Sequence, residues 1–452
     1  MKISIPETQL PKTLQQAIIV VRSLGIRYLW ADTLCIIQDS VADWQYESMR
    51  MGEIYKNATC TIAASGAANG DIGCFFQRDF SLLAPRQLPR RRGESARYCV
   101  DPFIWENDIE KGPLNYRGWV LQEMFLSPRI LHFGQNQIFY TCREMEACEA
   151  FEKGIPPMIG IKTGDLNLAS KMLSEKKEVD YSWYLQIWGK IVKEYSSRKL
   201  TKGEDKLVAL SGLAKEIQLR TGDEYLAGLW RRSLPMSLLW ACTDENAVRF
   251  QEYRAPSWSW AALDGEIVLD YFSKAIKHGQ YHNLVQVQEV KVISAIGDVM
   301  TQVSGGSLSL KGRLTTCSYI YTAGEIFGKL KTFIPNGEQV LDGDAYNDIR
   351  SLEEDRLVED LYCIPIILDN IHQVTADSED LDSIGCLLLQ YTQEARTFKR
   401  FGIYSSGQGD KNDNNGTNLL RDACDFFDAS TSIEDWDYEE TEQGKKYTIT
   451  II

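Results

Sequence analysis

Residues 10–65 decide the fold class: LPKTLQQAIIVVRSLGIRYLWADTLCIIQDSVADWQYESMRMGEIYKNATCTIAAS. Apolar residues recur at helical spacing in the first part, and Gly25 follows where a glycine commonly ends a helix. The apolar run 26–31 then predicts a buried strand, residues 43–55 a second helix and residues 59–64 a second strand. Alternating helices and strands with short connections are typical of a parallel sheet with covering helices. We therefore expect an α/β domain in which the two strands are parallel neighbours.

The pattern continues beyond this stretch to about residue 150. Residues 117–125 predict another helix, and two short apolar runs on either side of Gly134 predict a hairpin of strands 130–133 and 137–142. We take residues 1–150 as the first domain.

The rest of the chain changes character twice. Residues 151–284 form a predicted helical segment and linker, with apolar stripes at helical spacing over residues 181–250. Residues 285–452 predict a β-rich C-terminal domain, either a sandwich or a barrel. Its candidate strands, separated by glycine-rich turns, are 285–293, 307–314, 361–368 and 386–390.

Composition bounds the function classes. A net charge of −14 opposes binding of nucleic acid, because phosphate is repelled at long range. The 11 cysteines include no Cys-x-x-Cys pair and are expected to be reduced thiols. The N-terminus has no signal-peptide pattern, and no apolar run reaches the length of about 18 residues that a membrane span requires. We expect a cytoplasmic protein without a membrane span.

Four stretches resemble the fungal heterokaryon-incompatibility (HET) domain proteins. They are residues 10–65, PLNYRGWVLQEMFLSPRILHFGQNQIFYTC at 113–142, YLAGLWRRSLPMSLLW at 225–240 and YRAPSWSWAALDG at 253–265. The family's domain normally opens with a strand that carries a Ser-Tyr-x-Trp-Gly-like motif ahead of the Leu-Pro pair. Only nine residues precede Leu10 here, so we expect this copy to lack that strand and to expose an unpaired sheet edge.

The resemblance also implies a function. HET domains are similar to Toll/interleukin-receptor (TIR) domains, which have a flavodoxin-like sheet, and enzymatic TIR domains hydrolyse NAD with a Glu that follows a Trp on a helix. The run 43–47, Asp-Trp-Gln-Tyr-Glu, is similar to that motif. The resemblance implies a non-self recognition protein that triggers regulated cell death when incompatible cells fuse. Its expected partners are a second copy or another incompatibility protein, and NAD would be a substrate rather than a cofactor.

Glu47 is the first candidate for a catalytic carboxylate. A carboxylate on an apolar helix face is costly, burial raises its pKa, and such groups are often functional. The structural alternative is a Glu at the margin of the stripe that reaches water. The residues that share its face at helical spacing are Trp44, Met51 and Ile54.

Asp32 is the second catalytic candidate, since it follows strand 26–31 at the sheet edge where open α/β sheets bind ligands. Capping of the next turn is the structural alternative. We expect Glu47 within about 10 Å of Asp32. Trp30 and Trp44 either stack a base or nicotinamide or pack in the core, and Arg117 either pairs with a phosphate or forms a structural ion pair. The candidate NAD-binding residues are Trp30, Trp44, Arg117, Trp119, Gln122 and Glu123.

Other chemistries find less support. Cys35 and His132 lack a recognisable orienting third group, and the chain has only four His for a metal site. No phosphate-binding glycine pattern is present. Two hypotheses remain, an NAD-consuming enzyme and a non-catalytic signalling module that self-associates. Glu47 in an open pocket beside Asp32 favours the enzyme, whereas Glu47 sealed by a salt bridge favours the module.

Overall fold

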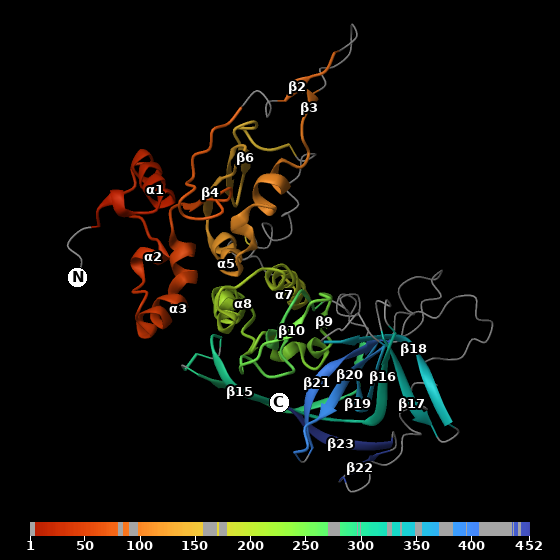
Figure 1. The fold of residues 1–452 in the computed structure, drawn as a ribbon. Helices are drawn as coiled ribbons and strands as arrows, with labels where there is room; N and C mark the ends of the chain where they lie inside the picture. Colours follow the sequence, from red (N-terminus) through yellow and green to blue (C-terminus); the bar gives the residue numbers. More distant parts are fainter. Residues whose placement is uncertain are drawn as a thin grey trace. The chain divides into compact units, whose positions relative to one another are not determined.

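The chain forms two compact units, described here from a computed structural model (Figure 1). Unit 1 comprises residues 1–178, 198–202 and 208–220, and unit 2 comprises residues 179–197, 203–207 and 221–452. The structure describes residues 5–79, 85–89, 98–156, 170, 179–269, 281–295, 297–298, 300–322, 328–334, 337–348, 355–369, 383–394, 396–405, 436, 438–441 and 444–452.

The helices of unit 1 follow the apolar pattern of the sequence. Ser40 accepts a hydrogen bond from the backbone N–H of Asp43 and so caps the longest helix of the unit. Gly25, with a φ of 69°, follows the first helix in the left-handed conformation that glycine adopts most readily. The helices are α1 (Lys12–Ser23), α2 (Asp32–Cys35), α3 (Val41–Asn57), α5 (Gly118–Leu126) and α8 (Ser211–Thr221), of which α8 belongs to unit 1 up to residue 220.

The sheet of unit 1 is mixed. Its four strands lie in the order β1 (Thr61–Ala63), β4 (Arg129–Phe133), β5 (Ile138–Cys142) and β6 (Glu146–Cys148). Only β1 and β4 pair in parallel, whereas β4, β5 and β6 form an antiparallel meander. A two-stranded ribbon of β2 (Arg86–Gln87) and β3 (Tyr98–Cys99) lies apart from this sheet. The predicted hairpin and the strand at 59–64 are confirmed.

The predicted strand at residues 26–31 is wrong, and so is its parallel pairing with residues 59–64. β1 pairs with β4 instead, and residues 26–31 belong to no sheet in the described part of the chain. The apolar, aromatic composition of this run favours a strand, but a strand forms only beside a neighbour that pairs with its backbone. The unit is thus mixed α/β with one parallel pair, and its flavodoxin-like details stay a prediction.

Contacts with α8 hold both α3 and α5 in unit 1. A Cβ atom on Gly52 of α3 would lie only 2.9 Å from the Cα of Gly212 in α8, so the helices meet without side chains between them. Gln122 of α5 accepts a hydrogen bond of 2.7 Å from the N–H of Gly212. The C-terminal half of α3 and the middle of α5 are therefore held in place by backbone as well as side-chain contacts.

The first part of unit 2 is built around tryptophans. Helix α7 (Tyr181–Ser196) is confirmed, but the helical prediction is wrong beyond α8, where short strands and 3₁₀ turns replace it. Ala227 and Gly228 have positive φ angles and turn the chain between β7 (Tyr225–Leu226) and β8 (Leu229–Trp230). The indole N–H groups of Trp188 and Trp260 both donate to the Gly228 carbonyl. The other strand pairs here are β9 (Ala241–Cys242) with β12 (Ile267–Val268), and β10 (Val248–Arg249) with β11 (Leu263–Asp264).

The C-terminal part of unit 2 contains a sheet that closes on itself as a barrel (Figure 1). Six antiparallel strands form the ring in the order β19 (Arg356–Asp369), β16 (Thr315–Tyr321), β17 (Gly328–Ile334), β18 (Gly337–Asn347), β21 (Thr397–Ser405), β20 (Ser383–Tyr391) and back to β19. The sheet continues outward through β23 (Gly444–Ile451), β15 (Val303–Gly312) and β14 (Gln286–Ser294), with β13 (Tyr281–Asn283) and β22 (Tyr438–Thr441) at its margins. Of the two predicted alternatives, the barrel is found.

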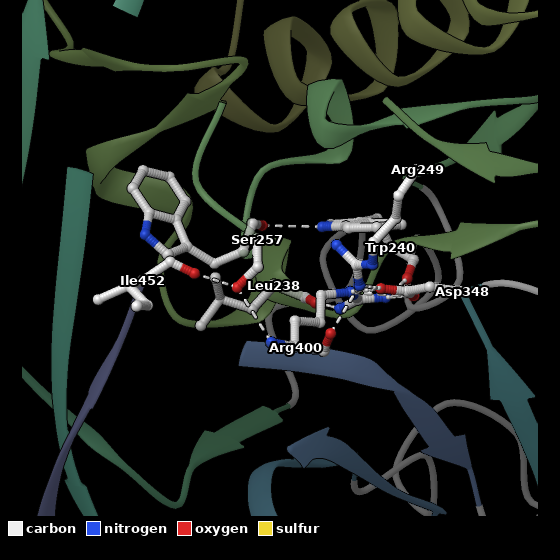
Figure 2. A network of polar contacts seen from close by, with 8 residues as sticks. Leu238, Trp240, Arg249, Ser257, Asp348, Arg400 and Ile452 are labelled. Atoms are coloured by element: carbon white, nitrogen blue, oxygen red, sulfur yellow. Dashed lines mark hydrogen bonds and ion pairs between the residues drawn. The ribbon is translucent and has the colours of Figure 1, made fainter. Parts of the chain in front are cut away.

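Arg400 joins this barrel to the tryptophan-rich segment within unit 2, as Figure 2 shows. Its buried guanidinium forms an ion pair with the buried carboxylate of Asp348 at 3.0 Å. The same group donates to the carbonyl oxygens of Leu238 and Trp240 and lies over the indole ring of Trp240. Each nitrogen of the guanidinium bonds protein atoms, so this network stabilises the contact of the barrel with the tryptophan-rich segment rather than binding a ligand.

Candidate functional site

Four polar side chains from three helices meet in unit 1. Asp32 is the first residue of α2, Tyr55 lies in the last turn of α3, and Arg117 immediately precedes α5, which carries Glu123. The charges of Asp32 and Arg117 act on both Tyr55 and Glu123, and Tyr55 and Glu123 share a side-chain hydrogen bond. We call these four residues the Glu123 cluster.

Glu123 has the most perturbed carboxyl of the cluster. Burial disfavours its charged form and raises its pKa to about 7. The hydrogen bond from Tyr55 and the positive charge of Arg117 act in the opposite direction, and the charge of Asp32 adds to the rise. The carboxyl group of Glu123 therefore exchanges a proton near neutral pH, as a general acid or base must.

Tyr55 donates to this carboxyl. Burial, then the neighbouring Glu123, raises the pKa of the Tyr55 phenol well above its ordinary value, so the hydroxyl remains a donor at every physiological pH. The ring of Trp30 meets the ring of Tyr55 edge to face, with centroids 5.8 Å apart. Trp30, one of the predicted NAD-binding residues, thus lies beside the cluster.

Arg117 is held by its backbone and exposed at its side chain. The N–H of Gly118 donates to the carbonyl of Lys199, and the N–H of Lys199 donates to the carbonyl of Tyr116. These bonds fix the backbone on both sides of Arg117. Among the residues that the structure describes, no carboxylate oxygen lies within 4.0 Å of its guanidinium. The arginine is therefore positioned to meet an anion.

Asp32 combines a structural contact with an exposed position. Its Oδ1 accepts a hydrogen bond of 2.8 Å from the N–H of Thr33, which is the turn-capping contact predicted as the alternative. The side chain is nonetheless exposed and acts electrostatically on Glu123. Turn capping and participation in the cluster are thus compatible.

Glu47 lies elsewhere on α3. Its Oε1 is 3.5 Å from the guanidinium of Arg50, which also lies over the ring of Tyr46. The Glu47 side chain is mostly buried whereas that of Arg50 is half exposed, so the ion pair is open to water on one side. The contacts described for Glu47 are with its own helix. Its expected position near Asp32 stays a prediction.

The remaining predicted residues divide by burial. Gln122 is fully buried, and its bond to Gly212 gives it a structural role in the contact of α5 with α8. Trp44 and Trp119 are mostly but not fully buried. The ammonium group of Lys202 lies 5.9 Å from the ring centroid of Trp44. Truncation of either tryptophan should therefore cost less than the 3–5 kcal/mol typical of a fully buried one.

Tyr55 was missed by the sequence analysis, although a signal for it exists. The buried residues of α3 are Ser48, Met51 and Gly52. Trp44, Ser48, Met51 and Tyr55 follow one another at spacings of four, three and four, so the stripe that faces the core runs through Tyr55 and places Glu47 at its margin. The predicted stripe shares Trp44 and Met51 with this one and differs by one residue at its other two positions.

Cys35 and His132 are not brought together. Cys35 is exposed on α2, whereas His132 is buried in β4 and bonds Thr141. Burial lowers the pKa of His132 to about 3, so the ring is neutral. Ten cysteines in the described part of the chain are free, and Cys424 lies outside it. Within the same residues, no group of His, Cys, Asp and Glu is arranged to hold a metal, and no helix is long and apolar enough to cross a membrane.

The comparison with known families supports the resemblance drawn from the sequence. Residues 1–123 match the family model described as heterokaryon incompatibility protein (HET). All members of the Glu123 cluster lie within these residues. No curated protein and no solved structure matches the chain. The chain therefore carries a match to the HET domain over its residues 1–123.

Proposed function

We propose that this protein acts in heterokaryon incompatibility by hydrolysing NAD at the Glu123 cluster, and that the loss of NAD triggers regulated cell death. The HET domain supports the incompatibility role. The observation that carries the enzymatic proposal is Glu123 itself, a partly buried residue whose pKa burial raises to about 7 beside Tyr55, Arg117 and Asp32. Strongly perturbed carboxyls with specific charge partners are concentrated at functional sites.

The chemistry requires a carboxylate. The bond between the nicotinamide nitrogen and the ribose breaks, nicotinamide leaves with the electron pair, and positive charge develops on the ribose. A water molecule then adds to the ribose carbon and loses a proton. The ionised Glu123 would stabilise the developing positive charge and accept that proton. Asp32 adds a second carboxylate whose charge acts at the same place.

Substrate binding would use the other residues of the site. The exposed guanidinium of Arg117 is suited to the pyrophosphate, because its planar fork matches phosphate oxygens. Trp30 offers an aromatic face for the nicotinamide beside Tyr55. Trp44 and Trp119, both partly buried, are the further stacking candidates. Tyr55 orients the Glu123 carboxyl through its hydrogen bond and needs no contact with the substrate.

Purified full-length protein incubated with NAD tests this proposal. Chromatography should show nicotinamide and ADP-ribose formed in equal amounts. Arg117→Leu should raise the KM for NAD, whereas Arg50→Leu, which removes an exposed arginine from the Glu47 ion pair, should leave KM unchanged. Absence of nicotinamide release by folded wild-type protein would contradict the proposal, and so would equal effects of the two arginine variants.

The second candidate function is a non-catalytic signalling module that works by self-association. Its support is the number of exposed apolar side chains in the first part of unit 1. Of the twenty large hydrophobic side chains found exposed among the described residues, eight belong to residues 5–46, namely Ile5, Ile19, Leu24, Tyr28, Leu34, Ile37, Val41 and Tyr46. Exposed apolar groups gathered in one region commonly mark a protein interface.

A further inference from the structure

We propose that residues 26–30, with Tyr28 at their centre, pair antiparallel with the same residues of a second copy, so that two chains join through a two-stranded, two-fold symmetric contact. The inference rests on the self-association candidate and gives it a geometry. It does not depend on NAD hydrolysis, because none of the bonds it requires involves the Glu123 cluster.

The first observation is the unpaired backbone of these residues. On one side, the N–H of Ile26 donates to Val21, and on the other, the carbonyl of Ala31 accepts from Leu34 and Cys35. Between them, no N–H or C=O group of residues 27–30 is bonded within the described part of the chain. The run has no turn or bend, and Ala31 has extended dihedral angles. Four consecutive residues thus leave their backbone groups unpaired, as the edge strand of a sheet does.

The second observation is the character of the side chains on this edge. Tyr28 is 82% exposed, more than any other large hydrophobic residue described. Residues 26–31 contain neither proline nor lysine and have Arg27 as their single charge, so the usual devices that protect an exposed edge from pairing are nearly absent. The residues are aromatic and β-prone in composition. This combination favours addition of a strand over permanent exposure to water.

A second copy fits this edge because the run is complementary to itself. In an antiparallel register centred on Tyr28, each Tyr28 faces its own equivalent, and Ile26 faces Trp30 of the other copy. Arg27 then faces Leu29, so the two arginines are not directly opposed. Aromatic and aliphatic side chains therefore meet across the contact, which is the favourable kind of cross-strand pair. A symmetric pair of this kind is the commonest form of homodimer.

The charge of the chain predicts how such a dimer responds to salt. Two chains of net charge −14 repel each other at long range. Salt screens that repulsion, whereas backbone hydrogen bonds and apolar contacts are little affected. Dimerisation through residues 26–30 should therefore strengthen as salt rises. A contact built on ion pairs would weaken instead.

Sedimentation of the full chain over a range of concentrations tests the proposal. Wild-type protein should form a dimer. Its dissociation constant should decrease by at least roughly twofold when the salt concentration is raised from about 50 to about 500 mM. Tyr28→Lys should weaken the dimer at least about tenfold, because it places a cation at the centre of the symmetric contact. Leu219→Lys, a change at a residue of α8 that is 76% exposed, should leave the dimer intact. Circular dichroism should show that both variants are folded.

Hydrogen exchange supplies a readout that concerns the backbone itself. Amides of residues 27–30 should exchange more slowly at protein concentrations that give dimer than at those that give monomer. Glu123→Gln should dimerise like the wild type, which separates this inference from the enzymatic proposal. A wild type that is monomeric at all concentrations overturns the proposal. So does a dimer that tolerates Tyr28→Lys, or one whose formation leaves these amides unprotected.

Discussion

The hydroxyl of Tyr55 and the carboxyl of Glu123 share a hydrogen bond that joins the last turn of α3 to α5. Each residue changes the proton affinity of the other. The Tyr55 hydroxyl lowers the pKa of Glu123, which burial has raised, whereas Glu123 helps to raise the pKa of Tyr55. The pair therefore keeps one group as a permanent donor and leaves the other able to titrate near pH 7.

Glu123→Gln should stabilise the fold at pH 8. A rise in pKa from 4.5 to about 7 means that the folded state holds the proton more tightly than the unfolded chain. The wild type is thus favoured most below pH 4.5, and its stability falls as pH rises to about 7. At higher pH, the ionised buried group costs at most roughly 3 kcal/mol, which the neutral amide removes. Chemical denaturation at pH 5 and pH 8 measures this.

Glu47→Gln is the matched control for that measurement, because the pair of Glu47 with a half-exposed Arg50 is worth little in stability. Its effect should stay within about 0.5 kcal/mol of the wild type at both pH values. A loss of stability in Glu123→Gln at pH 8 would show instead that Glu123 serves as the ionised half of a structural ion pair.

Tyr55→Phe should move the acidic limb of the pH profile of NAD hydrolysis to higher pH. The hydroxyl is a cause that lowers the pKa of Glu123, so its removal lets burial raise that pKa further. Activity that requires the ionised carboxylate then appears only at higher pH. The measurement is kcat/KM against pH for the two proteins. A lower rate with an unchanged limb would assign Tyr55 a packing role only.

Arg400→Leu should destabilise unit 2 by about 3–5 kcal/mol, because it removes the buried partner of the buried Asp348 carboxylate and leaves it with the partly exposed Arg249 alone. Arg249 binds the same carboxylate at 3.0 Å but is partly exposed, so Arg249→Leu should cost less, on the order of 1 kcal/mol. Denaturation monitored by tryptophan fluorescence compares them, since Trp240 lies against Arg400. Equal losses in the two variants would contradict the assignment of Arg400 as the centre of the network.

Elements whose pattern is complete within a short stretch could be predicted from the sequence. The C-terminal strands β16, β17, β18, β21 and β23 were not predicted. Helices α3 and α5, the β4–β5 hairpin and the four C-terminal strands that were predicted (β14, β15, β19 and β20) agree with their predicted positions to within a few residues. In each, apolar spacing or alternation is set by one face that meets the core. Residues 26–31 fail the same test because a strand is a property of two segments, and composition reports on one. Beyond α8, the glycine turn at Gly228 ends the helical pattern.

The candidate site was predicted in part. Asp32, Trp30, Arg117 and Glu123 were named, and the structure groups them, but Tyr55 and the leading place of Glu123 were not foreseen. The raised pKa of Glu123 arises from packing between helices that are far apart in the sequence. Periodicity within one helix cannot report such burial, and it favoured Glu47 because of an offset of one residue along α3.

The most direct test of the account compares Glu123→Gln with Glu47→Gln in cells that express the full chain. The account predicts that the wild type and Glu47→Gln deplete NAD and are toxic, whereas Glu123→Gln accumulates to the same level, leaves NAD unchanged and is harmless. NAD depletion that survives in Glu123→Gln, or that is abolished by Glu47→Gln alone, would contradict it.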